Sequence, residues 1–230
     1  MRELVLDTET TGFDPQQGDR IVEIGAVELI NQMPTGRTYH QYINPERAMP
    51  NDAFEVHGLG DDFLRDKPVF KQIAQEFLDF VGTDKMVIHN AAFDMKFLNA
   101  ELGWLNLPQL PWEQALDTLA IARKRFPGSP ASLDALCRRF NIDNSNRTLH
   151  GALLDSEILA EVYLELLGGR QPGLVLANSS GNTGSGGSEE TWRASKRPTP
   201  LPTRISEEEA KAHEAFVEKL GEDALWRKLN

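Results

Sequence analysis

Three short runs of apolar and polar residues near the start of the chain have the pattern of β-strands. Residues 4–9 (LVLDTE), 21–30 (IVEIGAVELI) and 38–45 (TYHQYINP) are rich in β-branched or aromatic side chains, and polar turns separate them. Strands that follow one another through short turns pair antiparallel. We therefore expect an antiparallel edge on a mixed sheet.

Longer runs with helical spacing follow, and one further strand lies among them. Residues 85–90 (KMVIHN) form a short apolar run that is typical of a buried strand. The alternation of strands with helices predicts an α/β domain over residues 1–167, in which helices cover a mixed central sheet. Apolar positions three and four residues apart predict helices over residues 69–81, 91–103, 113–126, 132–140 and 152–167.

The composition changes after this predicted domain. Residues 168–188 contain 7 Gly and 4 Ser, which indicates a flexible linker that we extend over residues 168–194. The remaining tail, residues 195–230, is charged and includes the run SEEEAKAHEAFVEKL. This run predicts a helix that begins with a capping box formed by Ser206 and Glu209.

The net charge of the chain is −11, and all of it lies in the predicted domain. Residues 1–167 contain 15 basic and 26 acidic residues, whereas residues 168–230 contain 9 of each. A protein that coats nucleic acid without specificity would need a basic surface instead. Carboxylates that hold divalent cations are nevertheless compatible with a nucleic-acid substrate, because the cations present positive charge to its phosphates.

The sequence indicates a cytoplasmic protein without a membrane anchor. The N-terminal run MRELVLDTETTG has no long apolar core of the kind that directs secretion, and no later run approaches the ~18 apolar residues of a membrane span. The single cysteine, Cys137, cannot form an internal disulfide, so we expect it in a reduced core.

Four carboxylates and one histidine are candidate catalytic residues. Asp7 and Glu9 are two positions apart on the first strand and project from the same face, where Mg²⁺ would offset their repulsion. Asp94 falls in the first turn of a helix, where it would also suit the helix dipole. Asp155 lies beside an apolar helix stripe and needs a partner. His150, five residues earlier, is expected on the loop that enters the same helix.

Together these residues resemble a known group of nucleases. The runs VLDTETTG, HNAAFD and LHGALLDSEILAEVY are similar to the three motifs of the four-acid-plus-histidine exonucleases, which have a ribonuclease-H-like fold. The runs IVEIGAVELI, SLDALCRRFNIDNS and RTLHGALLD further resemble the proofreading (epsilon) subunits of bacterial replicative DNA polymerase III. The resemblance covers residues 2–167 and resumes in the tail. It implies a 3′→5′ exonuclease that removes mispaired nucleotides during DNA replication.

The resemblance also implies a role for each candidate residue. Asp7, Glu9 and Asp155 would hold two Mg²⁺ or Mn²⁺ ions. The ions would clamp the attacking water and the leaving 3′ oxygen. Asp94 would hold a metal through water or shape the site around it. His150 would take the proton from the attacking water, a task that suits an imidazole near neutral pH.

Family members contact the terminal nucleotide from the segment that matches NDAFEVHGL, in addition to the metal-holding carboxylates. Here the matching residues are Asp52 and His57. Asp52 could instead cap a helix, and His57 could have a structural role beside Gly58. The implied substrate is a single-stranded or frayed 3′ DNA end.

Two segments predict protein partners. The run QPGLVL, from Gln171 to Leu176, resembles the short Q-x-x-L-x-L pattern with which polymerase subunits dock on the sliding clamp, although packing of Leu174 on the domain would explain it equally well. The apolar residues of the tail predict that residues 195–230 bind the catalytic (alpha) subunit of the polymerase.

Two other functions remain open at this point. An RNA-trimming exonuclease of the same fold would share every catalytic residue. A non-catalytic adaptor would tether partners through the linker and tail, but it would not need five intact catalytic positions.

Overall fold

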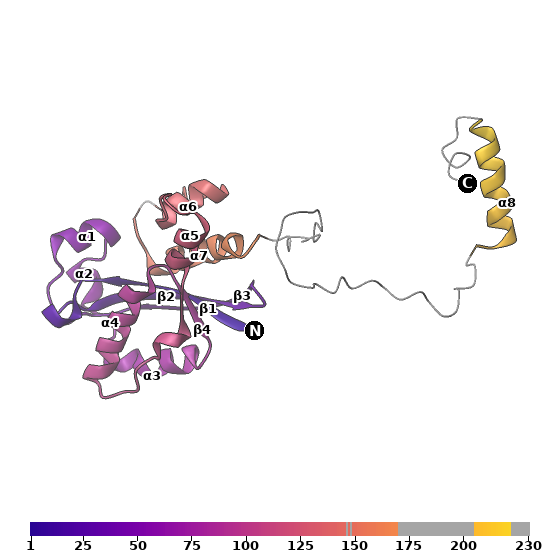
Figure 1. The fold of residues 1–230 in the computed structure, drawn as a ribbon. Coiled ribbons are helices and arrows are strands. Elements are labelled where there is room, and N and C mark those ends of the chain that lie inside the picture. Colours follow the sequence, from indigo (N-terminus) through magenta and orange to yellow (C-terminus); the bar gives the residue numbers. More distant parts are fainter. Residues whose placement is uncertain (146, 148, 170–204, 222–230) are drawn as a thin grey trace, which may run out of the picture. The chain divides into compact units, whose positions relative to one another are not determined.

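The computed structural model describes residues 1–145, 147, 149–169 and 205–221 (Figure 1). The chain divides into two units, Met1–Leu176 and Ala177–Asn230. The predicted clamp-binding run from Gln171 to Leu176 lies outside the described residues, and so does the end of the tail.

The first unit is built around a mixed five-stranded sheet with the order β3-β2-β1-β4-β5. Strand β1 pairs antiparallel with β2 and parallel with β4, so it lies at the centre of the sheet. The two remaining pairs are β2 with β3, antiparallel, and β4 with β5, parallel. The predicted mixed sheet with an antiparallel edge is confirmed. The strands are β1 (Arg2–Thr10), β2 (Ile21–Ile30), β3 (Met33–Tyr42), β4 (Lys85–Ile88) and β5 (Ala115–Asp117).

Helices cover both faces of this sheet (Figure 1). Side chains of α3 and α4 pack with Leu4 and Leu6 of β1 in one core cluster. Side chains of α5, α6 and α7 pack with Val5 in a second cluster on the other face. The helices are α1 (Asn51–His57), α2 (Asp61–Leu64), α3 (Phe70–Val81), α4 (Ala91–Trp104), α5 (Thr118–Arg125), α6 (Leu133–Phe140) and α7 (Ala152–Leu166), with short 3₁₀ turns η1 (Pro15–Gln17) and η2 (Trp112–Gln114).

The prediction of one helix over residues 113–126 was wrong in its first part. Residues 115–117 form the edge strand β5, which pairs with β4 from Met86 to Ile88. Helix α5 begins only after Asp117, whose side chain accepts a hydrogen bond from the amide of Leu119 at 2.9 Å. The Asp117 side chain thus caps the helix, and the pairing with β4 favours extended backbone before it, so that tertiary contacts override the local helical pattern.

The alternation of side chains along β1 determines which face carries the acids. Leu4 and Leu6 are fully buried on the face covered by α3 and α4. Val5 is buried on the opposite face, in the cluster with α7, and Asp7 and Glu9 share its parity on the strand. Both acids therefore project toward the side of the sheet on which α7 lies.

Helix α7 begins in direct contact with the backbone of β2. A Cβ atom added at Gly25 would lie 2.2 Å from the carbonyl carbon of Ala152 and 2.2 Å from the amide nitrogen of Leu153. The hydroxyl of Ser156 donates a hydrogen bond to the carbonyl oxygen of Gly25 at 2.9 Å. Because Gly25 pairs with Asp7 in the sheet, this contact places the first turn of α7 beside the acids of β1.

In the second unit the described residues form helix α8 (Glu207–Lys219). Its capping box is present, because the Ser206 hydroxyl accepts from the amide of Glu209 while the Glu209 carboxylate accepts from the amide of Ser206. Phe216 and Leu220 expose 57% and 46% of their surface. Across the described ranges of both units, no helix has the length and apolar character needed to cross a membrane.

Candidate active site

The five candidate catalytic residues lie in one pocket. Asp7, Glu9, Asp94, His150 and Asp155 all line a cavity of about 440 Å³. Asp7 and Glu9 come from β1, Asp94 from the first turn of α4, and Asp155 from the first turn of α7. His150 lies immediately before the N-cap residue of α7, on the entry loop where the sequence predicted it.

Hydrogen bonds from Thr8 hold Asp94 in the lining of this pocket. Its side chain is buried, and one carboxylate oxygen accepts hydrogen bonds from the amide of Thr8 at 3.1 Å and from the Thr8 hydroxyl at 2.7 Å. Burial raises the pKa of this carboxyl to about 7, although the hydrogen bonds from Thr8 oppose the shift. Asp94 thus links α4 to the strand that carries Asp7 and Glu9.

The two acids of β1 resist ionisation. Burial raises the pKa of Glu9 to about 8, with further contributions from the charges of Asp155 and of Glu23. Burial, followed by the charges of Asp94, Glu9 and Asp155, raises the pKa of Asp7 well above its ordinary value. Clustered carboxylates are the donor set that hard divalent cations prefer.

Glu23 is part of this environment, although it was not predicted to be a site residue. Glu23 lies on β2 directly opposite Glu9, and only 3% of its surface is exposed. Its carboxylate is hydrogen-bonded to Nε2 of His40 at 2.7 Å. The signal that could have found Glu23 is the register between β1 and β2, which is not evident from either strand alone.

Asp155 has a partner that the sequence analysis did not single out. The guanidinium of Arg147 donates from Nε to Oδ1 of Asp155 at 2.5 Å and from Nη2 to Oδ2 at 2.7 Å. Burial alone would raise the pKa of Asp155, but the contacts with His150 and Arg147 outweigh it and lower the pKa. The expectation that this buried acid needs a partner is met by a cation from its own entry loop.

His150 is the most accessible of the five residues, with 48% of its side chain exposed. Its amide donates to the carbonyl of Val56 on α1 at 3.0 Å, and its Nδ1 lies 2.7 Å from Nη2 of Arg147. Ligand atoms of Glu9, His150 and Asp155 lie within 4.8 Å of one another. This potential metal-binding group includes His150, which was not predicted to be a ligand.

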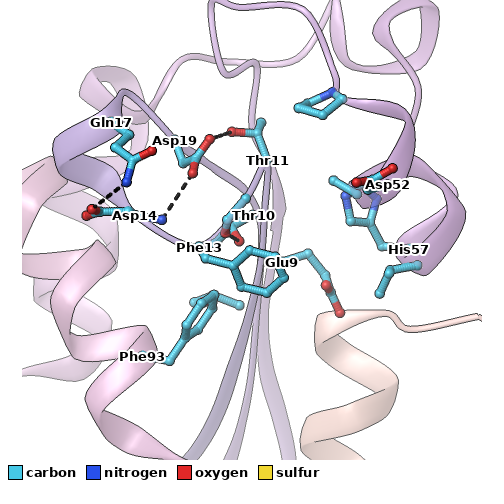
Figure 2. A pocket seen from close by; sticks show the side chains of 15 residues that line it. Glu9, Thr10, Thr11, Phe13, Asp14, Gln17, Asp19, Asp52, His57 and Phe93 are labelled. Atoms are coloured by element: carbon cyan, nitrogen blue, oxygen red, sulfur yellow. Dashed lines mark hydrogen bonds between the residues drawn. The ribbon is translucent and has the colours of Figure 1, made fainter.

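Asp52 and His57 lie in a neighbouring pocket instead (Figure 2). This cavity has a volume of about 460 Å³ and shares Thr8, Glu9, Phe13 and Phe93 with the carboxylate pocket. The interpretation of Asp52 as a helix cap was wrong, because Pro50 occupies the N-cap position of α1 and Asp52 lies in the first turn.

His57 is buried in the wall of this second pocket. Its Nδ1 accepts a hydrogen bond from the amide of Leu59 at 3.0 Å, while its Nε2 has no hydrogen-bond partner among the described residues. Burial lowers the pKa of His57, so the ring favours its neutral form. The nitrogen is buried, and the backbone of Thr10, another residue of the pocket wall, opposes the lowering of the pKa.

The fold and the acidic pocket define a nuclease of the exonuclease class. A family described as Exonuclease matches residues 4–163. The chain is 49% identical to DNA polymerase III subunit epsilon of Rickettsia felis over 223 residues, which is 96% of this chain and 97% of the relative. It is 45% identical to DNA polymerase III subunit epsilon of Escherichia coli (strain K12) over 237 residues, covering 98% and 97%. The chain belongs to the DNA polymerase III epsilon subunit family.

Solved exonuclease structures share the fold. Exonuclease X in complex with 5′ overhanging duplex DNA is 26% identical and superimposes with a TM-score of 0.58, covering 72% of this chain and 90% of that chain. The nuclease domain of 3′hExo, a DEDDh family member bound to rAMP, is 21% identical with a TM-score of 0.62, covering 72% and 91%. The second similarity supports the ribonuclease-H-like fold alone.

Proposed function

We propose that this chain is the proofreading subunit of DNA polymerase III and removes mispaired 3′-terminal nucleotides by metal-dependent hydrolysis. The observation that carries the proposal is the pocket in which Asp7, Glu9, Asp94, His150 and Asp155 meet. A four-acid-plus-histidine site of this kind is the His-type arrangement of such nucleases. A non-catalytic adaptor would have no need for it.

The acids of the pocket suit a pair of divalent cations, Mg²⁺ or Mn²⁺. Asp7, Glu9 and Asp155 would hold them, and Asp94, fixed by Thr8, would act through water or shape the site. When bound, the cations supply positive charge at the attacking and leaving oxygens of the scissile phosphate. At neutral pH, Glu9, with a pKa raised to about 8, would ionise fully only beside such charge.

His150 would act as the general base that takes a proton from the attacking water. The ring lies at the open side of the pocket, with its backbone tied to Val56 of α1. For this role one ring nitrogen has to be an acceptor that water can reach. The contact between Nδ1 and Arg147 occupies one of the two nitrogens in the present arrangement.

The neighbouring pocket would receive the terminal nucleotide. Asp52 and His57 line it, and the exposed ring of Phe13 lies at its edge beside Phe93 (Figure 2). Because Glu9 lines both cavities, a nucleotide seated there would place its phosphate next to the acids. Asp52 and His57 are thus proposed as contacts to the 3′-terminal nucleotide.

The second unit would attach the exonuclease to its polymerase. The exposed Phe216 and Leu220 near the end of α8 are suited to bind a groove on the catalytic (alpha) subunit. The run from Gln171 to Leu176 would dock on the sliding clamp. A tether of this kind raises the local concentration of the nuclease near a mispaired 3′ end.

The test measures nucleotide release in Mg²⁺ from a primer with a mispaired 3′ end. The same strand is also tested as single-stranded DNA and as RNA. Wild-type protein should release the terminal deoxynucleotide, and Asp155→Ala should abolish release while circular dichroism shows an intact fold. Glu157→Gln, which changes an exposed acid on the same helix, is the matched control. Preferential degradation of RNA would instead favour an RNA-trimming enzyme, and retained activity in Asp155→Ala would refute the proposed site.

A further inference from the structure

Helices α5 and α6 carry a concentration of positive charge on an otherwise acidic domain. Residues 118–140 contain 5 of the 15 basic residues of residues 1–167, but only 1 of their 26 acidic residues, Asp134. All five basic side chains are exposed, so a partner in solution can reach them. We call them the α5–α6 basic surface, and its members are Arg123, Lys124, Arg125, Arg138 and Arg139.

Carboxylates neutralise the other arginines of the domain but not those of this surface. Within the described part of the chain, none of the four arginines of the α5–α6 basic surface forms an ion pair with Asp or Glu. Asp134 accepts hydrogen bonds from Arg147 and Asn144 instead. Unpaired, clustered positive charge is the electrostatic footprint of a surface that binds a polyanion. The arginines of residues 1–167 that do form ion pairs are Arg2, Arg20, Arg37, Arg47, Arg65 and Arg147.

Aromatic contacts bring the cations of the two helices together. The rings of Phe126, after α5, and Phe140, at the end of α6, pack with their centroids 5.9 Å apart. The guanidinium of Arg139 lies 4.3 Å from the centroid of Phe126, and that of Arg125 lies 5.6 Å from it. Arg125 also donates to two backbone carbonyls at the end of α7, at 2.8 and 2.6 Å. These contacts position the guanidiniums without neutralising their charge.

The same segment borders the carboxylate pocket. The hydroxyl of Thr118, the first residue of α5, is hydrogen-bonded to Nδ1 of His89 at 2.9 Å, and His89 lines that pocket. Burial lowers the pKa of His89 and the charge of Arg123 adds to the shift, so Arg123 lies near the pocket wall. Ser132 and Leu133, where α6 begins, line the pocket as well. The α5–α6 basic surface therefore starts close to the acids.

The two pockets give a bound strand a direction. Among the described residues, the pocket of Asp52 and His57 is lined by none from α5 or α6, whereas the carboxylate pocket is lined by Leu133 and by His89. Glu9 lines both. A strand whose last nucleotide occupies the first pocket, and whose scissile phosphate meets the acids, therefore leaves the carboxylate pocket past His89 and α6.

We propose that the α5–α6 basic surface binds the phosphates of the DNA strand upstream of the 3′ end that is cut. The inference rests on the proposed exonuclease function. Arg125 contacts the backbone of Glu165, which lies about 15 Å along α7 from Asp155 at ~1.5 Å per residue. One strand of B-DNA has a phosphate every ~3.4 Å, so the surface meets phosphates up to about four nucleotides before the scissile bond. It thereby offsets the repulsion between DNA and the acidic domain.

The test compares two substrates of the full chain in Mg²⁺, a dinucleotide and a single strand of about 12 nucleotides. The variant combines Arg123→Gln, Lys124→Gln and Arg138→Gln, and it keeps the two arginines that contact Phe126. Loss of three phosphate contacts should raise KM for the longer strand by about 10- to 100-fold at 0.1 M salt, and should reduce the slope of log KM against log salt by about 2. The kcat of both substrates and KM for the dinucleotide should stay unchanged, because none of the three residues lines the carboxylate pocket.

The matched control removes the same net charge from other surfaces. It combines Lys67→Gln, Lys71→Gln and Lys85→Gln, which lie outside α5 and α6, and its KM and salt slope should equal those of the wild type. In the wild type itself, KM should fall as the strand lengthens from two to about six nucleotides and then level off. This measurement holds even if the variant fails to fold.

Three results would contradict the proposal. A KM of the wild type that does not depend on strand length would overturn it, and so would equal KM values for the longer strand in the variant and the control. Loss of co-elution with the polymerase catalytic subunit, at an unchanged KM for DNA, would assign the surface to an acidic protein partner instead. Failure of the wild type to cleave either substrate would overturn the proposed function, whereas the first two results would leave it in place.

Discussion

Replacing Glu9 by Gln should stabilise the metal-free protein at neutral and alkaline pH, although it removes a residue essential for the proposed activity. Burial and the neighbouring acids raise the pKa of Glu9 from 4.5 to about 8. A carboxyl whose pKa is raised by folding binds protons more tightly in the native state. Its contribution to stability is fully present below about pH 4.5 and is lost as the pH rises through about 8.

The size of this effect follows from the difference between the two pKa values. Each pH unit is worth about 1.4 kcal/mol, so the interval from 4.5 to about 8 corresponds to at most about 5 kcal/mol. Part of that energy is shared with Asp7 and Asp94, which remain in the variant. We therefore expect Glu9→Gln to raise the free energy of unfolding by about 2–4 kcal/mol at pH 9 and by little at pH 5.

The assay is urea unfolding in EDTA, followed by far-ultraviolet circular dichroism between pH 5 and 9. Stability of the wild type should decline across this range, and the decline should be shallower in Glu9→Gln. Saturating Mg²⁺ should flatten the wild-type profile, because bound cations favour the ionised acids. Glu157→Gln, an exposed acid on α7, should follow the wild type. Equal pH profiles for Glu9→Gln and wild type in EDTA would refute the idea that Glu9 carries uncompensated charge.

Three further changes test other parts of the molecule. His150→Ala should lower the rate by about 10²–10⁴ while Mg²⁺ binding persists, and it should remove the acid limb of the pH–rate profile; an unchanged profile would assign the proton to another group. Gly25→Ala should destabilise the fold by about 1–3 kcal/mol or more in thermal unfolding, because the added Cβ would lie 2.2 Å from the backbone of Ala152. Gly151→Ala is the control, because a Cβ added there would have no neighbouring atom within 4 Å. Deletion of residues 195–230 should leave hydrolysis of free single-stranded DNA unchanged and abolish co-elution with the catalytic subunit, so co-elution of the truncated protein would exclude the tail as the tether.

Local sequence patterns predicted the parts of the fold that rest on local physics. Period-two alternation identified β1 and placed Asp7 and Glu9 on one face, and helical spacing placed Asp94 in the first turn of its helix and Asp155 beside an apolar helix stripe. The strand β5 was missed, since a run of three residues in an otherwise helical pattern becomes extended only because β4 is available to pair with it.

The features of the site that were not predicted depend on contacts that no local pattern specifies. Glu23 affects Glu9 only through the register of two strands, and the Arg147 side chain contacts Asp155 of α7 from outside any helix or strand. Neither residue has a local signature, because an acid on a strand and an arginine in a loop are common surface features. Their role becomes evident only in the folded protein, where both side chains are buried.

The central position of β1 affects which part of the site is lost first in denaturant. Strand β1 pairs with β2 beyond both acids and with β4 from Glu3 to Val5, so we expect the acids to separate only when the core of the sheet unfolds. His150 and Arg147 lie outside regular secondary structure and depend on a few side-chain contacts. We expect slow amide hydrogen exchange at Asp7 and Glu9, governed by global unfolding, and fast exchange at His150 through local opening. Mild denaturant should therefore inactivate the enzyme before the sheet unfolds, and dilution should restore activity at the rate at which the loop closes.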